Sequence, residues 1–270
     1  SAARDFTSQT ATPTAHSIFG GVVYNLGETG PAGYSAGTWS CDGGVQSGAS
    51  ISVKIGKSVT CTIVNRDVPP QLTVIKHVIN DNGGTLTAND FTLGVKGTNP
   101  DPATFAGSES GTTVSLDAGA FAVTETPTSG YAVTYSAGCA GTIAVGDKPV
   151  TCTVTNDDIA PILQLRKTVV NDNGGTAVPA DFTLTATGTA GNDVSGTSPV
   201  DSGEALQADT WALTESSLPG YASGAWDCVG GSQEGSQISV GIGEEATCTI
   251  TNDDIAPVLR LRKTVVNDNG

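Results

Sequence analysis

The chain has 270 residues, of which 37% are apolar, and its formal net charge is −15. This charge argues against a nucleic-acid partner, because binding nucleic acid requires a basic surface that displaces counterions. No apolar run reaches the roughly 18 residues of a membrane helix, so we expect no membrane span in this chain. The 35 glycines and the short strand-like runs between Gly, Asn and Asp indicate an all-β fold.

A long internal repeat divides the chain into several small domains rather than one large one. Matching lysines occur at Lys76, Lys167 and Lys263, which are 91 and 96 residues apart. We expect a β-sandwich repeat that lacks its leading strand, two complete β-sandwich repeats, and a lone leading strand. Their boundaries are residues 1–68, 69–159, 160–256 and 257–270.

Within residues 69–159 we expect seven short strands separated by turns rich in Gly, Asn, Asp and Pro, which is typical of a small antiparallel β-sandwich. These strands lie near residues 72–79, 91–95, 112–116, 120–126, 131–136, 141–145 and 150–156. The linkers between repeats contain only a few residues and a proline, as in Ile159-Ala160-Pro161. Short proline-containing linkers favour an elongated, stiff array of tandem domains.

The six cysteines fall two to a repeat, and the second of each pair lies in the final strand. The pairs are Cys41 with Cys61, Cys139 with Cys152, and Cys228 with Cys248. Two thiols with no nearby histidine do not complete a tetrahedral zinc site, so the pattern predicts disulfides. Disulfides indicate an oxidising, extracytoplasmic setting.

Polar residues recur on the inward face of the strands at both ends of each repeat. Residues alternate in type along these strands, so Asn156 shares a face with Cys152, and Lys167 shares one with Leu163 and Leu165. In the middle of each repeat a glutamate ends a stripe of apolar residues. These glutamates are Glu28, Glu125 and Glu215.

A Lys, a Glu and an Asn directed into one core are the ingredients of an intramolecular isopeptide bond. Apolar burial disfavours charge, which lowers the pKa of an amine and raises that of a carboxyl. A neutral amine is a nucleophile, and a protonated carboxyl polarises the carboxamide and helps ammonia to leave. Folding itself supplies the proximity, so no separate enzyme is needed. The alternative is that the three residues form only a buried, hydrogen-bonded ion pair.

The order of these residues resembles that of the collagen-adhesin B-type, or SpaA-type prealbumin-like (Ig-like), domains of bacterial surface proteins and pilins. The resemblance rests on the Lys in the leading strand, the E-T-x-x-x-G-Y-like motif and the Asn in the last strand, and it covers nearly the whole chain. It implies an extracellular location at the bacterial surface and bond-forming roles for two sets of residues. These sets are Lys76, Glu125 and Asn156, and Lys167, Glu215 and Asn252. The paired cysteines depart from the pattern of that family.

Residues 257–270 carry the leading strand that the first repeat lacks. We therefore expect this segment of one copy to complete the first repeat of the next copy by strand addition, which places Lys263 near Glu28 and Asn65. Such head-to-tail pairing does not close and gives a filament. The alternative is a longer, uninterrupted repeat protein in which the same strand begins a further repeat.

Three other functions compete with a structural one. Acidic clusters at Asp157-Asp158 and Asp253-Asp254 offer oxygen ligands for calcium, although Asn, Asp and Gly are also ordinary turn formers. A hydrolase is disfavoured because His16 and His77 do not recur between repeats. We therefore expect no enzyme beyond self-bonding and no required cofactor. The sequence predicts an extracellular shaft or filament subunit, and the alternative is a surface adhesin with these repeats as its stalk.

Overall fold

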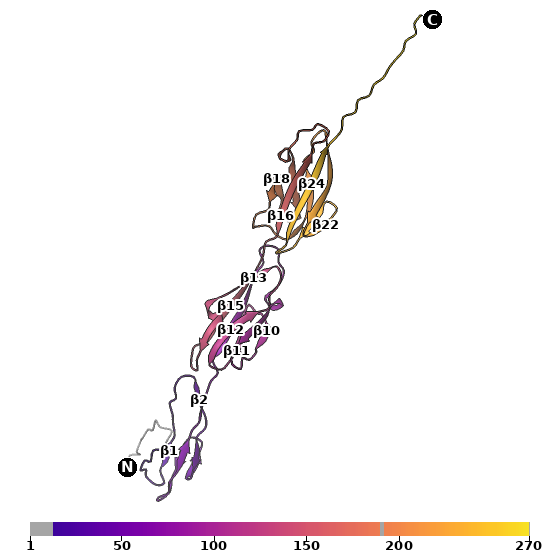
Figure 1. The fold of residues 1–270 in the computed structure, drawn as a ribbon. Coiled ribbons are helices and arrows are strands. Elements are labelled where there is room, and N and C mark those ends of the chain that lie inside the picture. The colour runs from indigo at the N-terminus through magenta and orange to yellow at the C-terminus, as the bar shows by residue number, and fades with distance from the viewer. Residues whose placement is uncertain (1–12, 190–191, 270) are drawn as a thin grey trace.

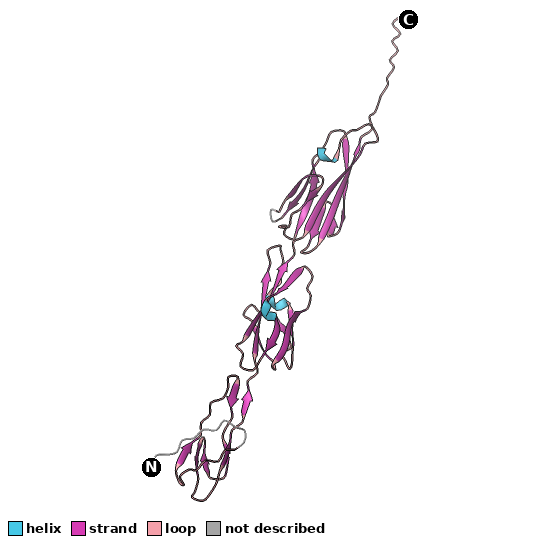
Figure 2. Ribbon diagram, turned by 60° about the vertical axis from the view of Figure 1, so that its left-hand side comes forward, coloured by secondary structure: helices cyan, strands magenta, loops and turns pink. Residues whose placement is uncertain are grey.

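A computed structural model describes residues 13–189 and 192–269 and arranges them as three β-rich units in a row, followed by an extended C-terminal segment (Figure 1). We call residues 13–68 unit one, residues 69–159 unit two, residues 160–256 unit three and residues 257–269 the tail. Figure 2 shows the same linear order from a second direction. Among the described residues, no helix has the length and apolar character required to cross a membrane.

Unit one is an incomplete sandwich of short strands. Its strands are β1 (Val23–Asn25), β2 (Tyr34–Ala36), β3 (Ser40–Asp42), β4 (Val45–Ser47), β5 (Ser50–Ser52), β6 (Thr60–Thr62) and β7 (Asn65–Asp67). They form a sheet in the order β1-β5-β4 and two pairs, β2-β7 and β3-β6. Within residues 13–68 only Ile51 and Val53 are buried, so this unit has almost no core of its own.

Unit two is a complete sandwich of two four-stranded sheets. Its strands are β8 (Gln71–Ile79), β9 (Thr92–Lys96), β10 (Thr104–Ala106), β11 (Thr112–Ser115), β12 (Gly119–Glu125), β13 (Tyr131–Tyr135), β14 (Ala140–Ile143) and β15 (Val150–Asp158). The sheets have the orders β11-β8-β15-β13 and β10-β9-β12-β14. Two short 3₁₀ helices, η1 (Ala88–Asp90) and η2 (Ala137–Cys139), link strands.

Unit three repeats this plan with longer strands. They are β16 (Ile162–Val170), β17 (Thr183–Gly188), β18 (Val194–Thr197), β19 (Val200–Asp201), β20 (Asp209–Glu215), β21 (Tyr221–Val229), β22 (Ser232–Glu234), β23 (Gln237–Val240) and β24 (Glu245–Asp254), with the 3₁₀ helix η3 (Pro179–Asp181). The sheets have the orders β19-β16-β24-β21 and β18-β17-β20-β23-β22.

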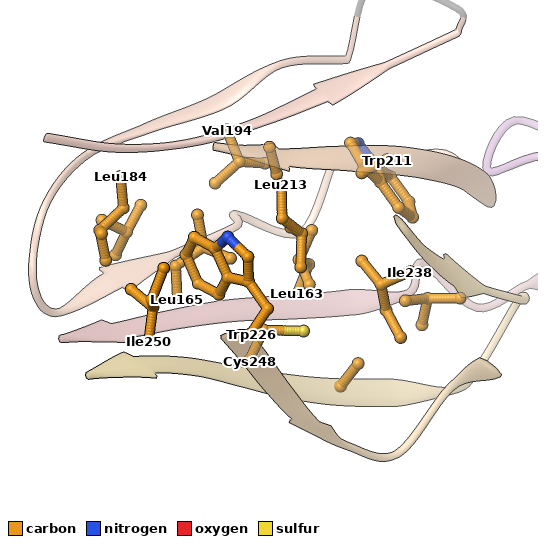
Figure 3. Close-up of a cluster of buried hydrophobic side chains, with 14 of the residues drawn as sticks. Leu163, Leu165, Leu184, Val194, Trp211, Leu213, Trp226, Ile238, Cys248 and Ile250 are labelled. Carbon is orange, nitrogen blue, oxygen red and sulfur yellow. The ribbon is translucent and has the colours of Figure 1, made fainter. Parts of the chain in front are cut away.

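The core of unit three shows why the strands alternate in residue type. Leu163 and Leu165 of β16, Trp211 of β20 and Ile238 of β23 are 0% exposed. Figure 3 shows that these side chains project from facing strands into one layer, with Cys248 and Trp226 beside them. Burial of every second residue fixes the register of each strand, because a shift of one position would turn its apolar face to water.

The all-β tandem sandwich agrees with the expectation, and two details differ. The first and last strands of each complete unit pair in parallel, β8 with β15 and β16 with β24, whereas the other ladders are antiparallel. A parallel pair needs a long crossover, which here is the rest of the unit. The strand β10 was not expected, because its three residues are too few to show an alternating pattern.

Candidate functional site

In unit two, three strands bring Lys76, Glu125 and Asn156 together. Lys76 lies on β8 and Asn156 on the adjacent parallel strand β15, where Lys76 is opposite Val154 and Val78 is opposite Asn156. Glu125 is the last residue of β12, which belongs to the other sheet. The two side chains of the parallel pair therefore point across the sandwich toward the carboxyl group.

The carboxyl of Glu125 contacts both partners. Its Oε2 lies 3.4 Å from Lys76 Nζ, and its Oε1 accepts a hydrogen bond of 2.7 Å from Asn156 Nδ2. The side chains of Lys76 and Glu125 are 0% and 1% exposed. Lys76 Nζ also donates to the main-chain oxygens of His77 at 3.1 Å and Val154 at 3.4 Å. A single carboxyl thus bridges an amine and a carboxamide in a site closed to water.

Unit three carries the corresponding residues on β16, β20 and β24, and its carboxyl contacts the amine. Lys167 Nζ lies 2.7 Å from Glu215 Oε2, and the two side chains are 0% and 8% exposed. Asn252 occupies the place of Asn156, is 2% exposed, and lies opposite Val169 in the parallel register. The carbonyl oxygens of Asn156 and Asn252 are both buried without a hydrogen-bond partner. In each complete unit the carboxamide oxygen therefore lacks the hydrogen bond that a buried polar atom normally has.

An aromatic ring lies beneath each amine. Lys76 Nζ is 4.3 Å from the ring centroid of Phe91, and Lys167 Nζ is 4.3 Å from that of Phe182. Burial in this apolar pocket lowers the pKa of Lys76, although the nearby charge of Glu125 opposes the shift. A lowered pKa increases the fraction of neutral, nucleophilic amine.

The two phenylalanines were not among the predicted site residues. Each is the middle residue of an Asp-Phe-Thr sequence that recurs in both complete units, at Asp90 and Asp181. The repetition itself was visible, but it did not indicate that the ring faces the amine. That contact depends on how β9 and β17 begin in the sheet opposite the lysine strand.

Unit one contains two of the three groups. Asn65 Nδ2 donates to Glu28 Oε2 at 2.9 Å, as Asn156 does to Glu125, and Asn65 Oδ1 is buried without a partner. Lys263 lies in the tail, where the described residues form no strand and are exposed. The structure of a single copy therefore does not bring Lys263 to Glu28 and Asn65.

Three disulfides connect the predicted pairs of cysteines. Cys41–Cys61 and Cys228–Cys248 join directly opposed residues of antiparallel strands, β3 with β6 and β21 with β24. Cys139–Cys152 joins η2 to β15. In units two and three the bridge is attached to the final strand, β15 or β24, which also carries the asparagine.

The acidic clusters serve the turns that follow the leading strands. Both oxygens of the Asp158 carboxylate accept hydrogen bonds from the main-chain N–H groups of Asp81, Asn82 and Gly84, at 2.6 to 3.0 Å. These bonds occupy the lone pairs that a cation would need, whereas Asp157 is exposed. The arrangement favours the turn-forming alternative over a calcium site.

Asp254 has the same role in unit three. It accepts main-chain hydrogen bonds from Asp172 and Asn173 at 3.0 Å and from Gly175 at 2.5 Å. Burial opposes ionisation of this carboxyl, but these hydrogen bonds outweigh it and lower the pKa of Asp254. Asp253, the remaining calcium candidate, is exposed.

Comparison with known proteins identifies the repeat. The sequence matches the prealbumin-like fold domain of the SpaA type in three tandem segments, residues 2–63, 67–162 and 157–250. No curated protein sequence matches the chain significantly.

Several solved structures are similar. The major pilin protein T-13 of Streptococcus pyogenes is 12% identical, with 70% of this chain and 98% of that chain covered and a TM-score of 0.32. The TIE protein of Bacillus anthracis is 15% identical, with 84% and 49% covered and a TM-score of 0.40. A C-terminal fragment of the pilus adhesin SpaC from Lactobacillus rhamnosus GG is 15% identical, with 71% and 100% covered and a TM-score of 0.37.

Proposed function

This chain belongs to the SpaA-type prealbumin-like fold domain family, and from that premise we propose that it is a structural subunit of an extracellular shaft or stalk whose units are closed by Lys–Asn isopeptide bonds. The observation that carries the proposal is the buried contact of one carboxyl with both an amine and a carboxamide in unit two. The bonds join Lys76 to Asn156 and Lys167 to Asn252.

The chemistry balances within each unit. The neutral amine of the lysine attacks Cγ of the asparagine, a C–N bond forms, the bond from Cγ to Nδ2 breaks, and ammonia leaves. Glu125 contacts both the nitrogen that loses a proton and the nitrogen that gains one, so a single carboxyl serves as base and then as acid. Glu215 has the same role in unit three. Since each site reacts only once and consumes its own side chains, the proposed reaction has no turnover.

The position of the bonds suits a protein that bears tension. Each bond links the first strand of a unit to its last, and these strands pair in parallel side by side. The chain enters unit three at β16 and leaves it after β24, so a pulling force passes through the bond rather than through the hydrogen-bonded ladders. The row of units in Figures 1 and 2 agrees with this role.

In the proposed assembly the tail supplies the leading strand of unit one in a neighbouring copy. Leu259 and Leu261 are 83% and 88% exposed, whereas their counterparts in β16, Leu163 and Leu165, are fully buried. In unit one, β7 pairs only with β2 and β6 only with β3, so the edge that β8 covers in unit two is open among the described residues. Strand addition buries this apolar face and satisfies both edges.

The registers of the complete units fix the expected register of the tail. Val74 lies opposite Cys152 and Leu165 opposite Cys248. By the same pairing Leu261 lies opposite Cys61, which places Lys263 beside Glu28 and Asn65. The bond formed there joins two copies covalently.

An extracellular location at a bacterial surface is part of the proposal. The family match and the three disulfides support it, since disulfides persist in oxidising compartments. The proposed partners are further copies of the chain, and no cofactor is required. An adhesin that uses these units as its stalk shares the same mechanics.

A denaturing gel under reducing conditions tests the assembly. We expect concentrated protein to form a ladder of covalent multimers, and we expect both Lys263→Ala and Asn65→Ala to abolish it. Lys96→Ala, which removes an exposed lysine of unit two, is the matched control and leaves the ladder intact. A ladder that persists in Lys263→Ala would contradict the proposed junction.

A further inference from the structure

The two junctions inside the chain use the same pair of turns. One is the turn that precedes the last strand of a unit, which we call the pre-strand turn. In all three units a main-chain hydrogen bond of 3.1 Å closes it. The other is the Gly-Tyr turn of the unit before. The pre-strand turns are residues 54–57, 144–147 and 241–244, and the Gly-Tyr turns begin at Gly33, Gly130 and Gly220.

At both internal junctions the pre-strand turn lies directly against the glycine. A β-carbon on Gly130 would lie 2.6 Å from Ile242 Cγ1, and one on Gly33 would lie 2.8 Å from Val145 Cγ1. Only glycine allows this approach, and both glycines also have a positive φ, +79° and +84°. The side chains of Val145 and Ile242 are half-buried as a result.

Main-chain hydrogen bonds complete the junction between units two and three. Gly243 N–H donates to Ile159 O at 2.7 Å, and Ala208 N–H donates to Asn82 O at 2.8 Å. Asn82 Nδ2 returns a bond of 3.1 Å to Leu206 O. The junction is therefore a specific contact between two units and more than a short linker.

Among the described residues of one copy, the pre-strand turn of unit one and the Gly-Tyr turn of unit three are the two of these surfaces that no other unit covers. Ile55, which corresponds to Val145 and Ile242, is 89% exposed. Gly220 has a φ of +87°, like the other two glycines, but nothing lies within 4 Å of its β-carbon position. A hollow at this end of unit three is lined by Gly220 together with Asn173, Leu218 and Ile255.

We propose that this hollow is the docking site for the pre-strand turn of unit one in a second copy, with Ile55 packed on Gly220 and Gly56 N–H donating to Ile255 O. The inference rests on the proposed strand donation, because the register that pairs Leu261 with Cys61 also pairs Val258 with Ser58, directly after that turn. The same register in unit three pairs Ile162 with Glu245, directly after residues 241–244. The contact would therefore reproduce the internal junction between copies.

Sedimentation velocity over a concentration series tests the contact in a Lys263→Met background, which blocks the covalent step and keeps the tail apolar. We expect Ile55→Asp to raise the dissociation constant of the head-to-tail dimer about tenfold or more, because a charge then replaces a buried isoleucine. Ile55→Val, which introduces the residue found at this place in the unit-two turn, should leave the dissociation constant close to that of the parent chain. Val45→Asp is the matched control, since Val45 is 60% exposed on the same unit but lies outside the turn.

Two outcomes separate this contact from the strand donation. Unchanged association of Ile55→Asp, with the covalent ladder still present in the chain that retains Lys263, would overturn the docking contact alone. If the Lys263→Met chain is a monomer at every concentration and the chain that retains Lys263 forms no ladder, both the docking contact and the strand donation are overturned.

A photo-crosslinking residue at position 55 gives a second, independent reading. With a mixture of isotope-labelled and unlabelled chains, we expect crosslinks between copies to the segment from Leu218 to Tyr221. Crosslinks confined to one copy, or to other segments, would overturn the proposal.

Discussion

Replacing Lys167 by Met tests what the proposed bond contributes to unit three. The substitution removes the amine but keeps an unbranched apolar side chain over the ring of Phe182, where a thioether packs well. Lys167 and Asn252 are 85 residues apart, and closing a loop of that length stabilises the fold by about 4.5 kcal/mol in the chain-entropy account of crosslinks. With a guanidinium m-value of about 2–4 kcal/mol per molar for a small domain, the midpoint should fall by about 1–2 M.

Tryptophan fluorescence follows this transition selectively in a Trp39→Phe background, because Trp39 of unit one is the third tryptophan of the chain. Trp211 and Trp226 are 0% and 8% exposed in unit three, and unit two contains no tryptophan. Lys76→Met is the matched control, because it removes the equivalent bond from unit two and should leave the tryptophan transition of unit three unchanged. An unshifted midpoint in Lys167→Met, together with proof that the parent chain carries the bond, would refute the loop-closure reasoning.

Three further predictions follow from individual contacts. In Asn156→Ala the amine of Lys76 stays free with a lowered pKa, so the unfolded state binds more protons than the folded state. The free energy of unfolding should therefore rise with pH toward the ordinary lysine pKa of about 10.4. Denaturation at several pH values measures this, and a rise that persists when Lys76→Met is added would contradict it. Gly130→Val should loosen the junction of units two and three and broaden the distance distribution in small-angle scattering. Gly220→Val should not, because Gly220 has a similar positive φ but open space around its β-carbon position. Equal effects of the two substitutions would refute the role of the close contact at Gly130. Asp158→Asn should destabilise the turn after β8 by about 1–3 kcal/mol. Hydrogen exchange should then show faster exchange of the amides in this turn, and unaltered exchange would argue that the carboxylate does not hold the turn.

The period-two pattern was sufficient to place the polar residues on the inward face, because alternation is a local property of each strand. It indicated that Lys76, Glu125 and Asn156 face one core, and the structure brings these three together. It did not indicate the parallel pairing of the first and last strands, since pairing over about 80 residues depends on the whole unit.

Other features required the three-dimensional arrangement. Asp158 reads equally well as a turn former or a cation ligand in the sequence, and only the fold brings its carboxylate to three main-chain N–H groups more than seventy residues away. The ring of Phe91 reaches the amine of Lys76 from the opposite sheet. The close approach of Ile242 to Gly130 joins two different units. Each of these contacts is long-range, so a reading of neighbouring residues does not reveal it.

The intact mass of the reduced, fully denatured chain is the most direct test of the Lys–Asn bonds. We expect a mass below that of the sequence by one ammonia for each complete unit, and Glu125→Ala should restore the ammonia of unit two alone. The full mass of the sequence, with all three disulfides reduced, would show that the bonds do not form and leave the buried Lys, Glu and Asn as a hydrogen-bonded ion pair.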